Sequence, residues 1–210
     1  MSPSAPGDRR AAPGSPSPRG KATEDRSGGD TLGRLVVVGV GLIGGSCALA
    51  LKRAGCVGEV VGVGRTQANL DIAVARAVID RACTLDADWT RELADADVVL
   101  VAAPVAQFPS LFVAMAGALG TRTIVTDAGS TKQDVIDAAA GAFGPALPRF
   151  VPGHPIAGTE QAGAAAAEHD LLQDRRCILT PTATTTATAR RRARALWSAA
   201  GMRVEELTAE

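Results

Sequence analysis

Aromatic side chains are scarce in this sequence, and tyrosine is absent altogether. Only 3% of the 210 residues are aromatic, and 22 basic residues balance 22 acidic ones, so the formal net charge is zero. A protein that binds nucleic acid typically has a basic surface and aromatic side chains on which bases stack. These shortages argue against nucleic acid as a partner.

Cysteine pairs and long apolar runs are missing as well. The four cysteines form no CxxC pair and lie in apolar or helical contexts, which is typical of reduced thiols, so we expect no metal site and a cytoplasmic setting. No apolar run is long enough to span a bilayer, and the N-terminus lacks the apolar core of a signal peptide. We therefore expect no membrane partner.

Residues 1–30 contain almost nothing that a core would bury. They are rich in Pro, Gly, Ser and charge, so ordering them would cost conformational entropy without a compensating gain. A transit peptide is a weaker interpretation, because Asp8, Glu24 and Asp25 are unusual in such leaders. We predict a disordered tail over 1–30 and one folded domain over 31–210.

Short β-branched runs alternate with amphipathic stretches from residue 34 onward. Such alternation predicts a mostly parallel sheet covered by helices on both faces, with ligands beyond the carboxyl ends of the strands. The expected strands or extended pieces are 34–39, 59–64, 97–104, 123–129, 149–155, 175–181 and 202–207, and the expected helices are 42–54, 67–78, 107–119, 131–142 and 184–201. Trp197 is expected to pack on the sheet, and the arginine run 190–194 to form a solvated helix face.

A glycine-rich loop lies between the first strand and the first helix. In Gly39-Val40-Gly41-Leu42-Ile43-Gly44, the first glycine suits a tight turn, the second a close approach of pyrophosphate, and the third close packing of helix on strand. The helix N-terminus then offers free N–H groups to phosphates. The alternative is that the glycines serve packing alone. In this context the loop predicts a Rossmann-type doubly wound domain that binds a dinucleotide.

The end of the second strand bears on the choice of dinucleotide. An NAD site usually has an acidic residue there that binds the ribose hydroxyls, but this chain has Gly64-Arg65-Thr66. An arginine and a hydroxyl can bind a 2′-phosphate, which a carboxylate would repel. These residues favour NADP, with NAD possible. Alternatively, Arg65 stacks on the adenine or points to water.

Two further segments follow strands at the same edge of the sheet. They are "DAGSTK", residues 127–132, and "GHPIAGTEQAG", residues 153–163. Because both follow strands at the carboxyl edge, Ser130 and His154 are expected to converge on one small molecule. Taken alone, His154 is more often structural, and Ser130 is more often the N-cap of the next helix.

The motifs "GVGLIGGS", "VLVAAPV", "TDAGSTK" and "GHPIAGTEQAG" occur in this order along the chain. In these residues the sequence resembles the prephenate/arogenate dehydrogenases of tyrosine biosynthesis, over residues 34–210. The resemblance implies an oxidative decarboxylation in which hydride passes to the nicotinamide, carbon dioxide departs and the ring becomes aromatic. Whether the substrate is prephenate or arogenate stays open.

The resemblance also implies roles for individual residues. His154 would bind the substrate hydroxyl and take its proton, and Ser130 would share that hydrogen bond. Thr159 and Glu160 would line or gate the substrate pocket, and Pro104 would contact the cofactor. Lys132 is left with two interpretations, electrostatic help to an anionic substrate or a surface lysine in the first helical turn.

Members of this family continue into a helical domain that supplies the dimer interface and further substrate contacts. We expect that domain to be missing here, so that the chain is truncated, and we expect a homodimer where it is present. A β-hydroxyacid dehydrogenase is one alternative, but its catalytic lysine lies in a later helical domain and "HPIAGTE" argues against it. A non-catalytic NAD(P)-binding module is the other.

Overall fold

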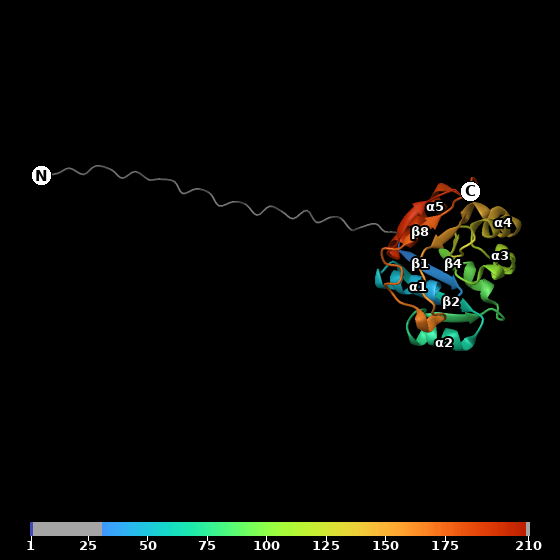
Figure 1. Cartoon of the computed structure of the whole chain (residues 1–210), viewed down its shortest axis with the longest axis horizontal. Helices are drawn as coiled ribbons and strands as arrows, with labels where there is room; N and C mark the ends of the chain where they lie inside the picture. The colour runs from blue at the N-terminus through green and yellow to red at the C-terminus, as the bar shows by residue number, and fades with distance from the viewer. Residues whose placement is uncertain (2–30, 209–210) are drawn as a thin grey trace.

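The computed structural model describes Met1 and residues 31–208, and the tail predicted over 1–30 lies outside them apart from Met1. A six-stranded sheet forms the centre of the fold (Figure 1). All of its neighbouring strands are parallel. In spatial order the strands are β3 (Arg81–Thr84), β2 (Val57–Gly64), β1 (Leu32–Val38), β4 (Val98–Val101), β5 (Ile124–Asp127) and β6 (Phe150–Val151). This is the 3-2-1-4-5-6 order of the Rossmann fold, which confirms the predicted fold class.

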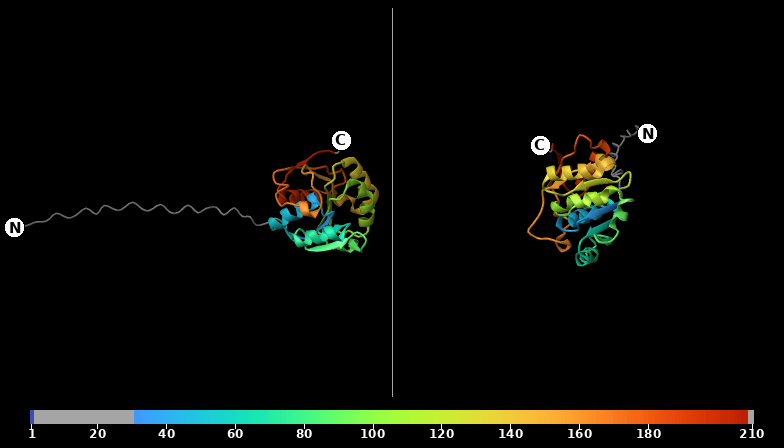
Figure 2. Two further views of the ribbon diagram at one scale, coloured as in Figure 1. Left: turned by 60° about the horizontal axis from the view of Figure 1, so that its bottom comes forward. Right: turned by 90° about the vertical axis from the view of Figure 1, so that its right-hand side faces the viewer.

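Helices cover both faces of this sheet. Helices α3 and α4 lie on the side that faces the viewer in the right-hand view of Figure 2. The opposite side carries α1 and α5, and α2 packs on β2 and β3. The helices are α1 (Leu42–Arg53), α2 (Gln67–Ala75), α3 (Phe108–Ala116), α4 (Lys132–Phe143) and α5 (Ala187–Ala199).

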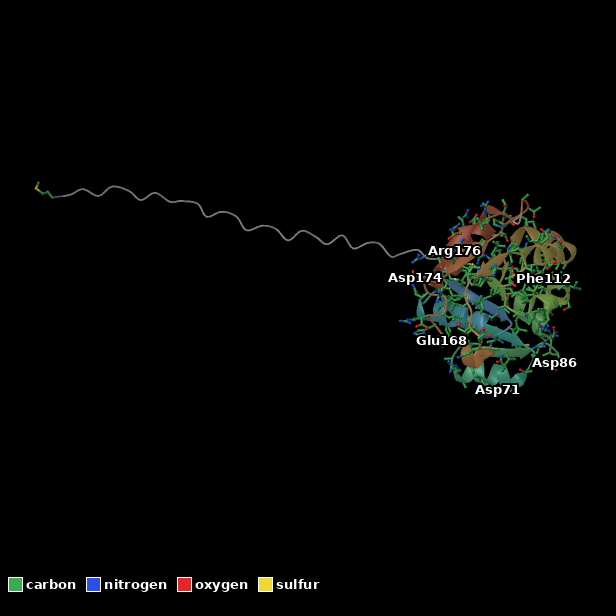
Figure 3. All side chains as sticks on the ribbon, viewed as in Figure 1. Asp71, Asp86, Phe112, Glu168, Asp174 and Arg176 are labelled. Atoms are coloured by element: carbon green, nitrogen blue, oxygen red, sulfur yellow. The ribbon has the colours of Figure 1, made fainter. Side chains whose placement is uncertain are left out.

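The central strand β1 supplies both cores because its side chains alternate between the faces. Leu35 and Val37 join the core under α1 and α5, whereas Val36 and Val38 join the core under α3 and α4. Trp197 is fully buried in the first core, as predicted. Phe112, which Figure 3 places on the α3 and α4 side, is buried in the second.

A second, three-stranded sheet was not foreseen. It consists of β7 (Gly153–Pro155), β8 (Arg176–Leu179) and β9 (Arg203–Glu206). The extended piece expected over 149–155 is therefore two strands, β6 and β7, which belong to different sheets and are separated by Pro152. A proline has no N–H to donate to a ladder, which suits a point where the chain leaves one sheet for another.

Other elements differ in detail from the expectation. Strand β3 was missed, as were four short 3₁₀ helices: η1 (Trp89–Leu93), η2 (Val105–Gln107), η3 (Gly144–Arg149) and η4 (Ala164–Ala166). The arginine run of α5 is largely solvated, and Arg190 and Arg194 pair with Glu206. Within the described part of the chain, no helix has the length and apolar character that a membrane crossing requires.

Candidate active site

Each glycine of the loop between β1 and α1 has a different role in the structure. Gly39 has φ +102°, and a Cβ there would lie 2.6 Å from the backbone of Ala102. A Cβ at Gly44 would lie 2.4 Å from the Gly39 carbonyl oxygen, so α1 packs too closely on β1 for any side chain. A Cβ at Gly41 would meet nothing within 4 Å. The first and third glycines thus build the turn, and the second leaves its outer side free.

Helix α1 begins at Leu42 without a capping side chain. Gly41 is the N-cap residue, and the first turn holds no acidic residue. The backbone N–H groups at the start of a helix have no partner within the helix and favour negative charge. The free side of Gly41 therefore adjoins a group of donors suited to phosphate.

Arg65 and Thr66 follow β2 at the same edge of the sheet. Both side chains are exposed, and neither has a hydrogen-bond or ion-pair partner among residues 31–208. Thr66 is the N-cap residue of α2, but its hydroxyl makes no capping hydrogen bond. The two side chains are free to bind an anion beyond the strand.

A cleft of about 460 Å³ brings the two predicted motif regions together. Its walls include the glycine loop, the end of β4, the end of β5, and β7 with the segment that follows. Among the predicted site residues, the cleft is lined by Gly41, Leu42, Ile43, Pro104, Ser130 and His154. The expected convergence of Ser130 and His154 beside the glycine loop is therefore present in the fold.

The remaining predicted residues lie elsewhere. Thr159 lines an adjoining cavity of about 560 Å³, which His154 also borders. Glu160 is exposed and lines neither cavity.

Ser130 is not the N-cap of α4, because that position belongs to Thr131. Ser130 is exposed on the cleft, so its hydroxyl is available to a ligand.

Lys132 is not a surface lysine, and this interpretation was wrong. Its side chain is 11% exposed, and its Nζ donates to Asp127 Oδ2 at 2.6 Å and to the Gly153 carbonyl at 2.6 Å. Burial lowers the pKa of Lys132 and raises the pKa of Asp127, while each partner stabilises the charged form of the other. Removing one partner of such a buried pair typically costs about 3–5 kcal/mol.

His154 is half-buried in β7, where it lies opposite Ile178 of β8. Burial lowers the pKa of its imidazole below the usual value, and the nearby positive charge of Lys132 lowers this pKa further. At neutral pH the ring is therefore uncharged and has a nitrogen that can accept a proton.

Sequence reasoning missed a residue that joins the two walls of the cleft. Asn69 of α2 donates from Nδ2 to the Val40 carbonyl at 2.7 Å and accepts at Oδ1 from the Ala164 amide at 2.8 Å. It thereby ties the glycine loop to the segment after His154, in which Gln161 also lines the cleft. No local sequence pattern predicts that an asparagine inside a helix makes these two long-range hydrogen bonds.

The sheet order, the glycine turn and the cleft at the carboxyl ends of the strands define a nucleotide-binding Rossmann domain. Residues 47–206 match the family "Prephenate dehydrogenase, nucleotide-binding domain", and the chain belongs to this family.

Its relatives agree with that assignment. Prephenate dehydrogenase of Lactococcus lactis is 32% identical over 148 residues, which are 70% of this chain and 40% of the relative. Cyclohexadienyl dehydrogenase of Zymomonas mobilis is 36% identical over 179 residues, which are 84% of this chain and 58% of the relative.

Solved structures show the same likeness. Prephenate dehydrogenase of Aquifex aeolicus, in complex with hydroxyphenyl propionate and NAD⁺, matches with a TM-score of 0.78 and 30% identity over 84% of this chain and 60% of that chain. Synechocystis arogenate dehydrogenase matches with a TM-score of 0.74 and 29% identity, over 83% of this chain and 59% of that chain. The chain thus spans between about two fifths and three fifths of the length of these relatives.

Proposed function

We propose that residues 31–210 form the nicotinamide-dinucleotide-binding domain of an enzyme that oxidatively decarboxylates prephenate, arogenate or both. One observation carries this proposal: Ser130 and His154 lie in the same cleft as the glycine loop. A non-catalytic binding module would not need a neutral imidazole and a hydroxyl at that place.

The residues present fit a nicotinamide dinucleotide. The free side of Gly41 and the uncapped start of α1 suit the pyrophosphate. Arg65 and Thr66 suit a 2′-phosphate, so NADP is the preferred cofactor. NAD is the alternative, and it is the nucleotide in the Aquifex aeolicus complex.

The chemistry of the cleft follows from its two side chains. His154, neutral at working pH, accepts the proton of the substrate hydroxyl as the carbon that bears it is oxidised. Ser130, which has both a donor and acceptors, orients that hydroxyl toward the imidazole. A nicotinamide ring bound between these residues and the glycine loop would supply the hydride acceptor. Loss of carbon dioxide then leaves an aromatic ring.

The test is an assay of NADP reduction with prephenate and with arogenate as separate substrates. In a full-length context that includes the family's helical domain, we expect turnover with at least one of them, and we expect His154→Asn to lower it by about 10²- to 10⁴-fold. Residues 1–210 assayed by themselves should show little or no turnover, because the substrate contacts from that domain would be absent. Cofactor affinity should stay unchanged, because His154 is not part of the phosphate-binding loop. Absence of turnover with both substrates in that full-length context, or a His154→Asn variant as fast as the parent there, would contradict the proposal.

A further inference from the structure

Asp127, the last residue of β5, is completely buried beneath the cleft. Both of its carboxylate oxygens accept hydrogen bonds. Oδ1 accepts from the Gly153 amide at 3.0 Å, and Oδ2 accepts from the Gly129 amide at 2.7 Å and from Lys132 Nζ at 2.6 Å. Three donors directed at one carboxyl group are what an ionised carboxylate requires.

The two amides bonded by Asp127 belong to the two catalytic segments. Gly129 directly precedes Ser130, and Gly153 directly precedes His154. Lys132 links Asp127 to Gly153 a second time, since its Nζ also donates to the Gly153 carbonyl at 2.6 Å. The carboxylate and the ammonium therefore hold Gly153 by its N–H and by its C=O.

The two segments are packed tightly on Asp127. A Cβ at Gly153 would lie 2.7 Å from the Asp127 carbonyl oxygen, and one at Gly129 would lie 3.0 Å from Asp127 Oδ2. The backbones before Ser130 and His154 are thus packed directly on Asp127. Because Asp127 has no exposed surface, it does not touch a ligand in the cleft.

We propose that Asp127 is a positioning residue whose buried carboxylate, paired with Lys132, holds the backbones preceding Ser130 and His154 in one fixed arrangement. This inference rests on the proposed function, because it assigns those two residues to the reaction. It adds a residue that acts through both of them at once. The ammonium of Lys132 also lowers the pKa of His154, which keeps the imidazole neutral.

The decisive variant is Asp127→Asn, and Asp97→Asn is its matched control. Asp97 also accepts hydrogen bonds from two backbone amides. Its Oδ2 accepts from Gly33 N–H at 2.7 Å and from Arg34 N–H at 3.1 Å. It lies just before β4, at the opposite end of the sheet from the cleft. In Asp127→Asn, the amide group brings N–H donors toward groups that are themselves donors, so the backbone hydrogen bonds cannot all persist.

We expect Asp127→Asn to lower turnover by about 10- to 100-fold, since small misplacements of reacting groups have effects of that size. NADP affinity should stay within about twofold, because the glycine loop is held by other contacts. The imidazole NMR signals of His154 should move in this variant and stay in place in Asp97→Asn. A folded Asp127→Asn variant that matches Asp97→Asn in both turnover and His154 signals would overturn the proposal.

A second measurement on the unaltered chain covers the case in which Asp127→Asn does not fold. Because one carboxylate holds both amides, the Gly129 and Gly153 amide protons should exchange slowly and with similar protection. Free exchange of either amide would overturn the proposal. If the parent turns over neither substrate in the full-length context, the proposed function fails, whereas amide exchange and the His154 signals still test the positioning role of Asp127.

Discussion

The two walls of the cleft are built by different physical means. The glycine-loop wall, formed by the turn between β1 and α1, depends on close backbone packing: Gly39 and Gly44 have no room for a side chain. The opposite wall, which carries Ser130 and His154, depends on a fully buried carboxylate and its ammonium partner. The first wall therefore tolerates no added atoms at its two tight glycines, and the second tolerates no change in charge at Asp127 and Lys132.

The largest effect is expected from a methyl group at the tight glycine of the first wall. Gly44→Ala places a Cβ 2.4 Å from the Gly39 carbonyl oxygen, which is backbone and cannot move aside cheaply. Overpacking of this kind typically costs about 1–3 kcal/mol. Chemical denaturation should show a loss of stability in this range or above it, together with weakened NADP binding.

Gly41→Ala is the matched control for that variant. Nothing lies within 4 Å of a Cβ at Gly41, and its φ of −116° is open to any residue. The variant should fold with the stability of the parent yet bind NADP more weakly, because the methyl group occupies the side from which we propose that pyrophosphate approaches. Equal stability of the two alanine variants would show that close packing does not hold this wall.

An effect of up to similar size is expected beside the first wall, where Arg65 follows β2 at the same edge of the sheet. Arg65→Ala should weaken NADP binding by about 10- to 150-fold, the value of one charge-assisted hydrogen bond, and should leave NAD binding unchanged. Arg53→Ala, at the far end of α1, removes an exposed arginine remote from the cleft and serves as control. Calorimetric titration with both nucleotides measures the difference. An Arg65→Ala variant that keeps its preference for NADP would refute this assignment.

The smallest effect concerns protonation on the second wall. Burial, and then the charge of Lys132, lower the pKa of His154 below 6.5 in the folded chain. The unfolded state therefore takes up the proton first, so this group's contribution to stability is present above pH 6.5 and is lost as the pH falls below it. NMR titration of the imidazole should give a midpoint below the unfolded value. A midpoint at or above 6.5 would show that the second wall does not act on His154.

The contrast between the walls also explains how much could be predicted from the sequence. The tight turn at Gly39 and the close packing at Gly44 are local requirements of one turn, so six consecutive residues were enough to predict them. The convergence of Ser130 and His154 on one cleft was predictable because both follow strands at one edge of the sheet; the catalytic roles that their motifs imply stay a prediction.

Long-range polar contacts could not be predicted in this way. The bond between Asp127 and the Gly153 amide spans 26 residues, and that between Asn69 and the Ala164 amide spans 95. Such contacts depend on where the chain passes in space, which neither periodicity nor propensity encodes. The choice between the two interpretations of Lys132 was left open for the same reason, since a lysine in a first helical turn is usually solvated. The break at Pro152 was missed because β6 and β7 read as one extended run.

We propose that the cleft between the two walls holds the nicotinamide end of the cofactor beside His154. Nuclear Overhauser effects from the nicotinamide ring protons of bound NADP to the two imidazoles test it, with the signals assigned by His169→Gln. His169 is a built-in comparison, because it lines a separate cavity of about 660 Å³ beside the end of α1. We expect effects to His154 and none to His169. Effects to His169 instead, or to neither ring while NADP is bound, would contradict it.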